Sequence, residues 1–153
     1  MNTPFNFRLT KFPNEAEILR HEVREFLSDA LKDVPKETRA ETWYGADENF
    51  SRKVGQQGWI GLNWPKEYGG AGRSSMERYV ILEEMLTAGA PVGAHWISDR
   101  QSGPLIIRYG TEKHQKELLP GILKGESYFC IGMSEPDSGS DLAALRTKAE
   151  RKG

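Results

Sequence analysis

The stretch YFCIGMSEPDSGSDLAA, residues 128–144, is where the sequence changes character. Its beginning belongs to the run SYFCIGM at residues 127–133, which is short, aromatic and compatible with β structure, and therefore predicts a strand. A polar turn containing proline and glycine follows it. The last segment, LRTKAERKG at residues 145–153, can open a second strand. We expect Cys130 to be a small buried residue of the first strand.

Upstream of Glu126, the pattern is that of helices. Residues 14–35 carry apolar side chains at helical spacing, namely Leu19, Val23, Phe26, Leu27, Ala30 and Leu31. Asn14 is predicted to cap this helix, with Glu17 completing a capping box, and Pro35 is predicted to end it. The first 125 residues are therefore expected to form a mainly α-helical unit.

The following segment has a weaker helical pattern and then a long loop. Residues 40–59 predict a helix with Trp43, Phe50 and Val54 facing inward. Residues 58–74, GWIGLNWPKEYGGAGRS, hold five glycines and a proline and cannot form a regular helix. We expect an ordered loop there, anchored by apolar and aromatic side chains: Trp59, Leu62, Trp64 and Tyr68.

Three more helical segments precede the change of character. Residues 74–91 begin with Ser74 as the cap, have Glu77 at the capping-box position, and end at Gly89 and Pro91. Residues 92–110 are apolar on several sides, which predicts a buried helix interrupted at Gly103 and Pro104. Residues 111–126 begin with Thr111 as the cap and have an apolar side made of Leu118, Leu119, Ile122 and Leu123.

Composition and charge exclude several classes of function. The chain has 153 residues, 28% of them charged and 37% hydrophobic, with a formal net charge of -1. This balance fits a globular domain and argues against electrostatic binding of nucleic acid or an anionic membrane. No apolar run approaches the length of a membrane span, and no secretory signal is visible. With a lone cysteine, we expect a reduced, cytoplasmic location.

The three histidines show no spacing that would suit a metal ion. His21 and His114 are predicted to face solvent. His95 lies beside Trp96 in the apolar segment, and we interpret it as a core histidine whose hydrogen bonds are satisfied. No metal site is therefore expected.

One or two strands at the end of a helical chain cannot form a stable sheet, since isolated strand pairs are marginal in water. Either they pack on the helical body or the chain is a piece of a longer protein, and we favour the second interpretation. The predicted division is a helical domain at residues 1–125 and the beginning of a β domain at residues 126–153.

Residues 132–144, GMSEPDSGSDLAA, resemble the flavin-binding pattern of the acyl-CoA dehydrogenase family at every fixed position. That pattern has small residues, an aliphatic residue or Met, Ser or Thr, Glu, Gly and Asp at set intervals. Residues 58–72, GWIGLNWPKEYGGAG, and 109–126, YGTEKHQKELLPGILKGE, resemble two further family segments. The resemblance extends from about Glu15 to Gly153. It implies an N-terminal helical domain of up-down, bundle-like type, followed by one or two strands of a β-barrel-like middle domain.

The resemblance also implies FAD as the cofactor and α,β-dehydrogenation of an acyl-CoA thioester as the reaction. Ser134 matches the Ser or Thr that meets the flavin edge, and Ile131, Gly132 and Met133 match the strand whose backbone lies along the ring. Gly139 and Ser140 match positions at the FAD pyrophosphate and the pantetheine of the substrate. The segment of Trp96 lines part of the acyl pocket in the family, which makes Trp96 a substrate-binding candidate.

No catalytic residue is predicted within the chain, because the family places its base in the later helical bundle. Glu135 is interpreted as an acceptor of local backbone hydrogen bonds, and Asp141 as the cap of the turn at residues 142–145. A chain ending at Gly153 is therefore expected to be inactive alone.

The family further implies transfer of electrons to an electron-transferring flavoprotein and a dimer or tetramer of like or unlike chains. Some segments look closest to members that act on bulky acyl groups, including steroid side chains. Two alternatives stay open: an acyl-CoA oxidase or flavin monooxygenase of the same fold, and a non-catalytic helical module or subunit completed by another chain.

Overall fold

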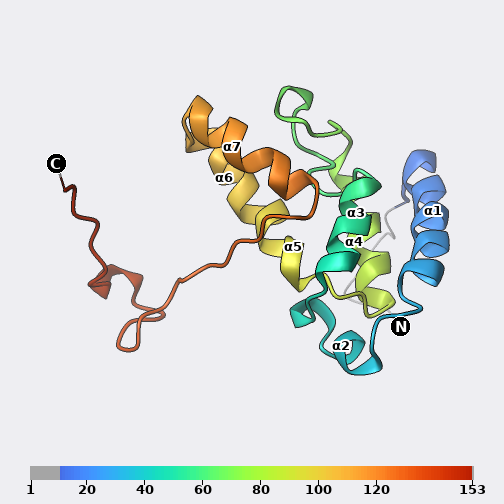
Figure 1. The fold of residues 1–153 in the computed structure, drawn as a ribbon, viewed down its shortest axis with the longest axis horizontal. Coiled ribbons are helices and arrows are strands. Elements are labelled where there is room, and N and C mark those ends of the chain that lie inside the picture. The colour runs from blue at the N-terminus through green and yellow to red at the C-terminus, as the bar shows by residue number, and fades with distance from the viewer. Residues whose placement is uncertain (1–10, 153) are drawn as a thin grey trace, which may run out of the picture.

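The computed structural model describes residues 11–152. Residues 1–10, in which the sequence shows no secretory signal, lie outside the described residues, as does Gly153. The chain forms a helical body and an extended tail that leaves it after α7 (Figure 1). The α-helices are α1 (Asn14–Ala30), α2 (Lys36–Ala40), α3 (Glu48–Gln56), α4 (Ser75–Thr87), α5 (Gly93–Ile97), α6 (Gly103–Tyr109) and α7 (Glu112–Leu123). Shorter turns are η1 (Thr42–Tyr44), η2 (Lys66–Tyr68), the π-helical η3 (Ser98–Ser102) and η4 (Leu142–Ala144).

The principal helix pair of the body is α1 with α4. The predicted stripe of α1 is confirmed, because Leu19, Val23 and Leu27 are buried and belong to the main apolar core. Burying a side chain of this kind contributes about 1.5–3 kcal/mol. On the facing helix, Val80 and Met85 are buried as well. The apolar stripe at helical spacing thus determines which face of α1 meets α4.

A partly buried ionic cluster also joins α1 to α4. The carboxylate of Glu84 accepts hydrogen bonds from Arg20 at 2.5 Å and from Arg24 at 2.7 Å. Arg20 also donates to Glu83 at 2.6 Å and Glu17 at 3.1 Å. The two guanidinium groups lower the pKa of Glu84 despite its burial, and the hydrogen bond from Arg24 has the largest effect. The acid stays charged because its partners come from the opposite helix.

Two of the three predicted helix caps are confirmed. Ser74 and Glu77 form the expected capping box of α4, and Thr111 caps α7 together with His114. The Asn14 cap was wrong: Pro13 occupies the N-cap position, and Asn14 is the first residue of α1 with no side-chain cap bond. Pro35 begins α2 and does not end α1, which stops at Ala30.

The predicted loop is ordered by its aromatic residues. Trp59, Leu62 and Trp64 are buried, and Tyr68 packs against the core. Gly61 has a φ of 69°, a left-handed conformation that favours glycine.

The weaker helical pattern before the loop was partly wrong. In place of one helix, residues 40–59 contain the last residue of α2, the turn η1 and the helix α3, and Asp47 caps α3 by accepting from the Phe50 amide. Phe50 and Val54 are buried as expected. Trp43 is 45% exposed, because it lies in η1 outside the regular helix.

The helix predicted to be interrupted at Gly103 and Pro104 has helical backbone there, and α6 begins at Gly103. The irregularity lies one turn earlier, in the π-helical Ser98–Ser102. The indole Nε1 of Trp64 donates to the Asp99 carbonyl oxygen at 3.2 Å. A Cβ on Gly103 would lie 2.1 Å from the same indole ring. Trp64 therefore packs where the helix widens, and only glycine leaves it room.

The predicted strands were wrong, since the described part of the tail contains no strand. Its regular features are an isolated bridge between Glu135 and Ser138 and the short turn η4. A strand must pair its backbone groups with a neighbour. Cys130 is exposed and not buried as expected. The mainly helical class is confirmed, and the division into domains at Gly125 stays a prediction.

Candidate functional site

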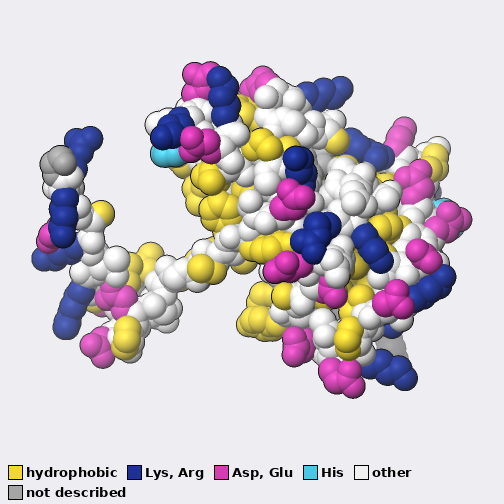
Figure 2. Space-filling view, viewed as in Figure 1, with side chains coloured by type: hydrophobic (Ala, Val, Ile, Leu, Met, Phe, Trp, Pro, Cys, Tyr) yellow, Lys and Arg dark blue, Asp and Glu magenta, His cyan; other side chains and the backbone are white. Residues whose placement is uncertain are grey.

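An open hollow of about 820 Å³ lies between the helical body and the first part of the tail. One wall is aromatic and comes from η1 and α5. The rings of Trp43 and Tyr44 lie 4.0 Å apart between centroids, and those of Trp43 and Trp96 lie 5.8 Å apart. Figure 2 shows hydrophobic side chains on the side of the helical body from which the tail departs. This wall offers flat apolar faces to a ligand.

The opposite wall is made by four consecutive residues of the tail: Ile131, Gly132, Met133 and Ser134. Ile131 is 42% exposed and Met133 is 68% exposed, which is unusual for large apolar side chains that lie in a hollow. Apart from Gly132 and its two chain neighbours, no described residue has an atom within 4 Å of the position of a Gly132 Cβ. Within residues 11–152, the backbone of these four residues makes no hydrogen bond. The wall therefore presents free backbone donors and acceptors.

The turn after Ser134 brings the other two predicted cofactor residues near this wall without adding them to it. The Glu135 and Ser138 backbones exchange hydrogen bonds of 2.8 and 3.1 Å. This turn places the Cβ position of Gly139 3.9 Å from the Ser134 hydroxyl oxygen. Ser140 is exposed and lies outside the hollow.

Glu135 acts locally, as the sequence predicted. Its carboxylate accepts from the Arg146 amide at 2.9 Å and the Thr147 amide at 2.6 Å. The Thr147 hydroxyl also donates to it. These bonds lower the pKa of Glu135, and the bond from the Thr147 side chain has the largest effect. Asp141 occupies the cap position of η4, but its side chain makes no cap bond.

A third feature of the hollow is a positive charge from the π-helical turn. Arg100 and Gln101 both line it, and Arg100 lies 5.7 Å from the Trp96 ring centroid. The preceding residue, Asp99, does not pair with Arg100, because its carboxylate binds other groups. It accepts from Arg78 at 2.7 Å and from the Gly61 amide at 2.7 Å.

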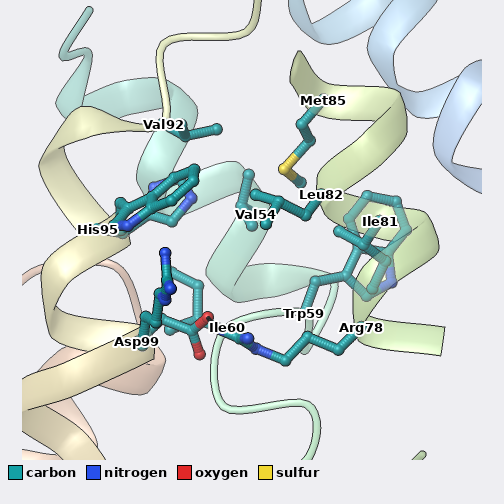
Figure 3. A pocket seen from close by; sticks show the side chains of 12 residues that line it. Val54, Trp59, Ile60, Arg78, Ile81, Leu82, Met85, Val92, His95 and Asp99 are labelled. Atoms are coloured by element: carbon teal, nitrogen blue, oxygen red, sulfur yellow. Dashed lines mark hydrogen bonds and ion pairs between the residues drawn. The ribbon is translucent and has the colours of Figure 1, made fainter. Parts of the chain in front are cut away.

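Beside the hollow lies a small enclosed cavity, which Figure 3 shows with Asp99 and Arg78 approaching from its two sides. Its volume is about 30 Å³, which leaves room for only a few water molecules. It is therefore too small for a cofactor or an acyl group. Trp96 and Arg100 line both spaces and form the partition between them.

His95 is a core residue, as predicted, and does not line the hollow. It is buried, and its Nδ1 lies 2.8 Å from the Oγ of buried Ser51 in a hydrogen bond. Burial lowers the pKa of His95 from 6.5 to about 4, against an opposing effect of Asp99. His21 and His114 are exposed, as expected. In residues 11–152, no group of three acidic, histidine or cysteine side chains suits a metal ion.

The structure thus brings together Trp96 and the segment from Ile131 to Ser134, which lie far apart in the sequence. The positions of Tyr44 and Arg100 in the hollow were not predicted from the sequence, and the prediction that Trp43 faces the core was wrong. Two adjacent aromatic residues, Trp43 and Tyr44, lie in a segment with a weak helical pattern. This pairing was the one sequence feature that could have indicated an aromatic wall. None of the helices in the described part of the chain is long and apolar enough to cross a membrane.

Comparison with known proteins gives one consistent result. Residues 13–126 match the family described as "Acyl-CoA dehydrogenase, N-terminal domain". The acyl-CoA dehydrogenase FadE26 of Mycobacterium tuberculosis is 37% identical over 95% of this chain and 37% of its own. The chain therefore spans little more than a third of that relative's length.

Solved structures show the same similarity. The ChsE4–ChsE5 complex from Mycobacterium tuberculosis has a TM-score of 0.80 at 36% identity, covering 95% of this chain and 37% of that one. A glutaryl-CoA dehydrogenase from Mycobacterium smegmatis, in complex with FADH2, has a TM-score of 0.73 at 26% identity. The matched region covers 93% of this chain and 36% of the glutaryl-CoA dehydrogenase.

Proposed function

This chain belongs to the acyl-CoA dehydrogenase family, and on that premise we propose that it supplies the N-terminal helical part of a FAD-dependent acyl-CoA dehydrogenase. The hollow is then one side of the flavin and acyl-CoA site. The observation that carries this proposal is the meeting of Trp96 with the segment from Ile131 to Ser134 across the hollow.

The tail wall has the chemistry that a flavin ring requires. A planar heteroaromatic ring needs apolar contact on its faces and hydrogen-bond partners at its polar edge. Ile131 and Met133 offer exposed apolar side chains, and the unpaired backbone offers the edge partners. Gly132 leaves open space for a close approach. The residues present therefore fit the group.

Each residue of this wall has a proposed role. When bound, FAD supplies the hydride acceptor for dehydrogenation between the α and β carbons of the thioester. The Ser134 hydroxyl and a neighbouring backbone N–H donate to its ring edge, where negative charge develops, by the electrostatic logic of an oxyanion hole. Gly139 and Ser140 provide donors for the pyrophosphate, and Ser140 also for the pantetheine. Trp96 packs on the acyl group.

The catalytic base is proposed to come from outside this chain. Among the described residues that line the hollow there is no Asp or Glu. A general base needs a free lone pair within reach of the substrate proton. We therefore expect no turnover by this chain alone.

The whole protein is proposed to be a cytoplasmic oligomer of two or four chains that passes electrons to an electron-transferring flavoprotein. The multi-chain character of a close structural relative, the ChsE4–ChsE5 complex, supports the oligomer. Straight-chain or steroid side-chain acyl groups are the proposed substrates, because the resemblance covers members of both kinds.

Flavin binding tests the proposal directly. FAD is added to the chain, excess is removed by gel filtration, and retained flavin is read by its absorbance near about 450 nm. Ser134→Ala is expected to weaken binding about two- to tenfold, the worth of one net hydrogen bond. Ser28→Ala, at an exposed position of α1, is the control.

Failure of the chain to retain any FAD would contradict the assignment of the hollow. Equal affinities of the wild type and Ser134→Ala would contradict the role of Ser134. Turnover of an acyl-CoA by the chain alone would contradict the proposal that the base lies elsewhere.

A further inference from the structure

We propose that Arg100 makes the hollow selective for an acyl group whose far end carries a carboxylate. This inference rests on the proposed function and names the substrate class of the same site. It starts from charge, because Arg100 is the only charged side chain among the described residues that line the hollow.

Arg100 has no acidic partner within residues 11–152, where it forms neither a salt bridge nor a side-chain hydrogen bond. The adjacent acid cannot serve, since Asp99 is paired with Arg78 at 2.7 Å and with the Gly61 amide at 2.7 Å. A guanidinium is always charged and presents donors in a planar fork that matches a carboxylate. The hollow thus contains a solvent-exposed positive charge without an internal counter-ion.

The position of this charge is set by the fold. Arg100 lies in the π-helical turn, and such turns occur frequently at functional sites. Its guanidinium lies over the Trp96 ring, 5.7 Å from the centroid, in cation–π geometry. Because Trp96 belongs to the aromatic wall, this contact holds the cation at the edge of the apolar surface. A ligand would therefore meet the aromatic faces with its body and the guanidinium with its end.

This arrangement favours one class of acyl group. An apolar chain or ring system gains from burial against Trp43, Tyr44 and Trp96. A terminal carboxylate would pair with Arg100 in a charge-assisted and bidentate hydrogen bond. A methyl end at the same place would leave the cation unpaired. A phosphate of the coenzyme is a second source of the same anionic chemistry, and the experiment separates the two.

The probes are pairs of CoA thioesters of equal length. Mono-CoA thioesters of straight dicarboxylic acids with five, seven and nine carbons are compared with the corresponding methyl-ended acyl-CoAs. Binding is read by quenching of tryptophan fluorescence, for which Trp43 and Trp96 in the hollow are internal reporters. The variants are Arg100→Gln, Arg100→Lys and the matched control Arg108→Gln. Arg108 is an exposed arginine stacked on its own neighbour Tyr109 and lies outside the hollow.

For the wild type and Arg108→Gln, we expect the best-matched carboxylate probe to bind about tenfold more tightly than its methyl-ended partner. In Arg100→Gln this preference is expected to fall below about twofold, with unchanged affinity for the methyl-ended probes. Arg100→Lys keeps the positive charge but lacks the planar pair of donors that a guanidinium offers. This variant is expected to keep an intermediate preference for the carboxylate probe. The same helical circular dichroism in all variants shows that the fold is intact.

Three results would overturn the inference. The first is a wild type without preference at any length, and the second is the same preference in Arg100→Gln. The third is an equal loss of affinity for both probe types in Arg100→Gln, which would assign Arg100 to a phosphate. In each case binding of FAD and of methyl-ended acyl-CoA leaves the proposed function standing. If the chain bound no acyl-CoA at all, that result would contradict both the inference about Arg100 and the proposed function.

Discussion

Acidification is expected to destabilise this protein through one residue, His95. Its imidazole is buried, and burial lowers its pKa from 6.5 to about 4. The folded state therefore binds this proton less readily than the unfolded state does. Stability contributed by neutral His95 is fully present above about pH 6.5 and is lost as the pH falls toward the folded pKa.

The magnitude follows from these two values. At pH 5, most unfolded chains carry a proton on this residue and most folded chains do not. Linkage between pH 7.5 and pH 5 then lowers the free energy of unfolding by about 2 kcal/mol. The acids whose pKa the fold lowers, such as Glu84, lose most of their contribution below their ordinary value of 4.5. The window between pH 7.5 and pH 5 therefore isolates the histidine.

The assay is urea unfolding followed by tryptophan fluorescence at several pH values in this window. His95→Asn is the matched variant, because its side-chain amide replaces Nδ1 in the hydrogen bond to Ser51 but does not titrate. The variant is expected to be less stable at pH 7.5, since it is smaller, but to lose little further stability at pH 5. Equal pH slopes for wild type and His95→Asn would refute the reasoning.

The remaining predictions concern the helical body and are read as shifts in urea unfolding. Ser74→Ala removes the capping box of α4 and is expected to cost about 1 kcal/mol; a change near zero would contradict the cap. Glu84→Ala removes the acid that Arg20 and Arg24 share and is expected to cost about 1.5–3 kcal/mol, whereas Glu83→Ala, at a more exposed acid, should cost less than about 1 kcal/mol. Gly103→Ala places a methyl group against the Trp64 indole and should cost about 1–3 kcal/mol or more. Gly132→Ala, in open space, should leave stability unchanged, and an equal loss in both glycine variants would contradict the packing argument.

The resemblance that the sequence displays is strongest where the structure is least regular. The residues 132–144 indicate the family by their type and order, because a cofactor site demands particular small and polar residues. The same residues form no strand here, since a strand depends on a neighbouring chain segment to pair with. Sequence patterns that reflect binding chemistry and those that reflect local structure can therefore diverge in one segment.

What the sequence alone determined was local: helical stripes, the Ser74 and Thr111 caps, the aromatic anchors of the loop and the core position of His95. These features follow from residue type and spacing over a few turns. What only the tertiary structure decided was which distant segments meet. Trp64 packs against Gly103 beside the π-helical turn, and the hollow forms where the tail passes Trp43 and Trp96. Contacts of this kind depend on shape complementarity across the chain, which no periodicity encodes.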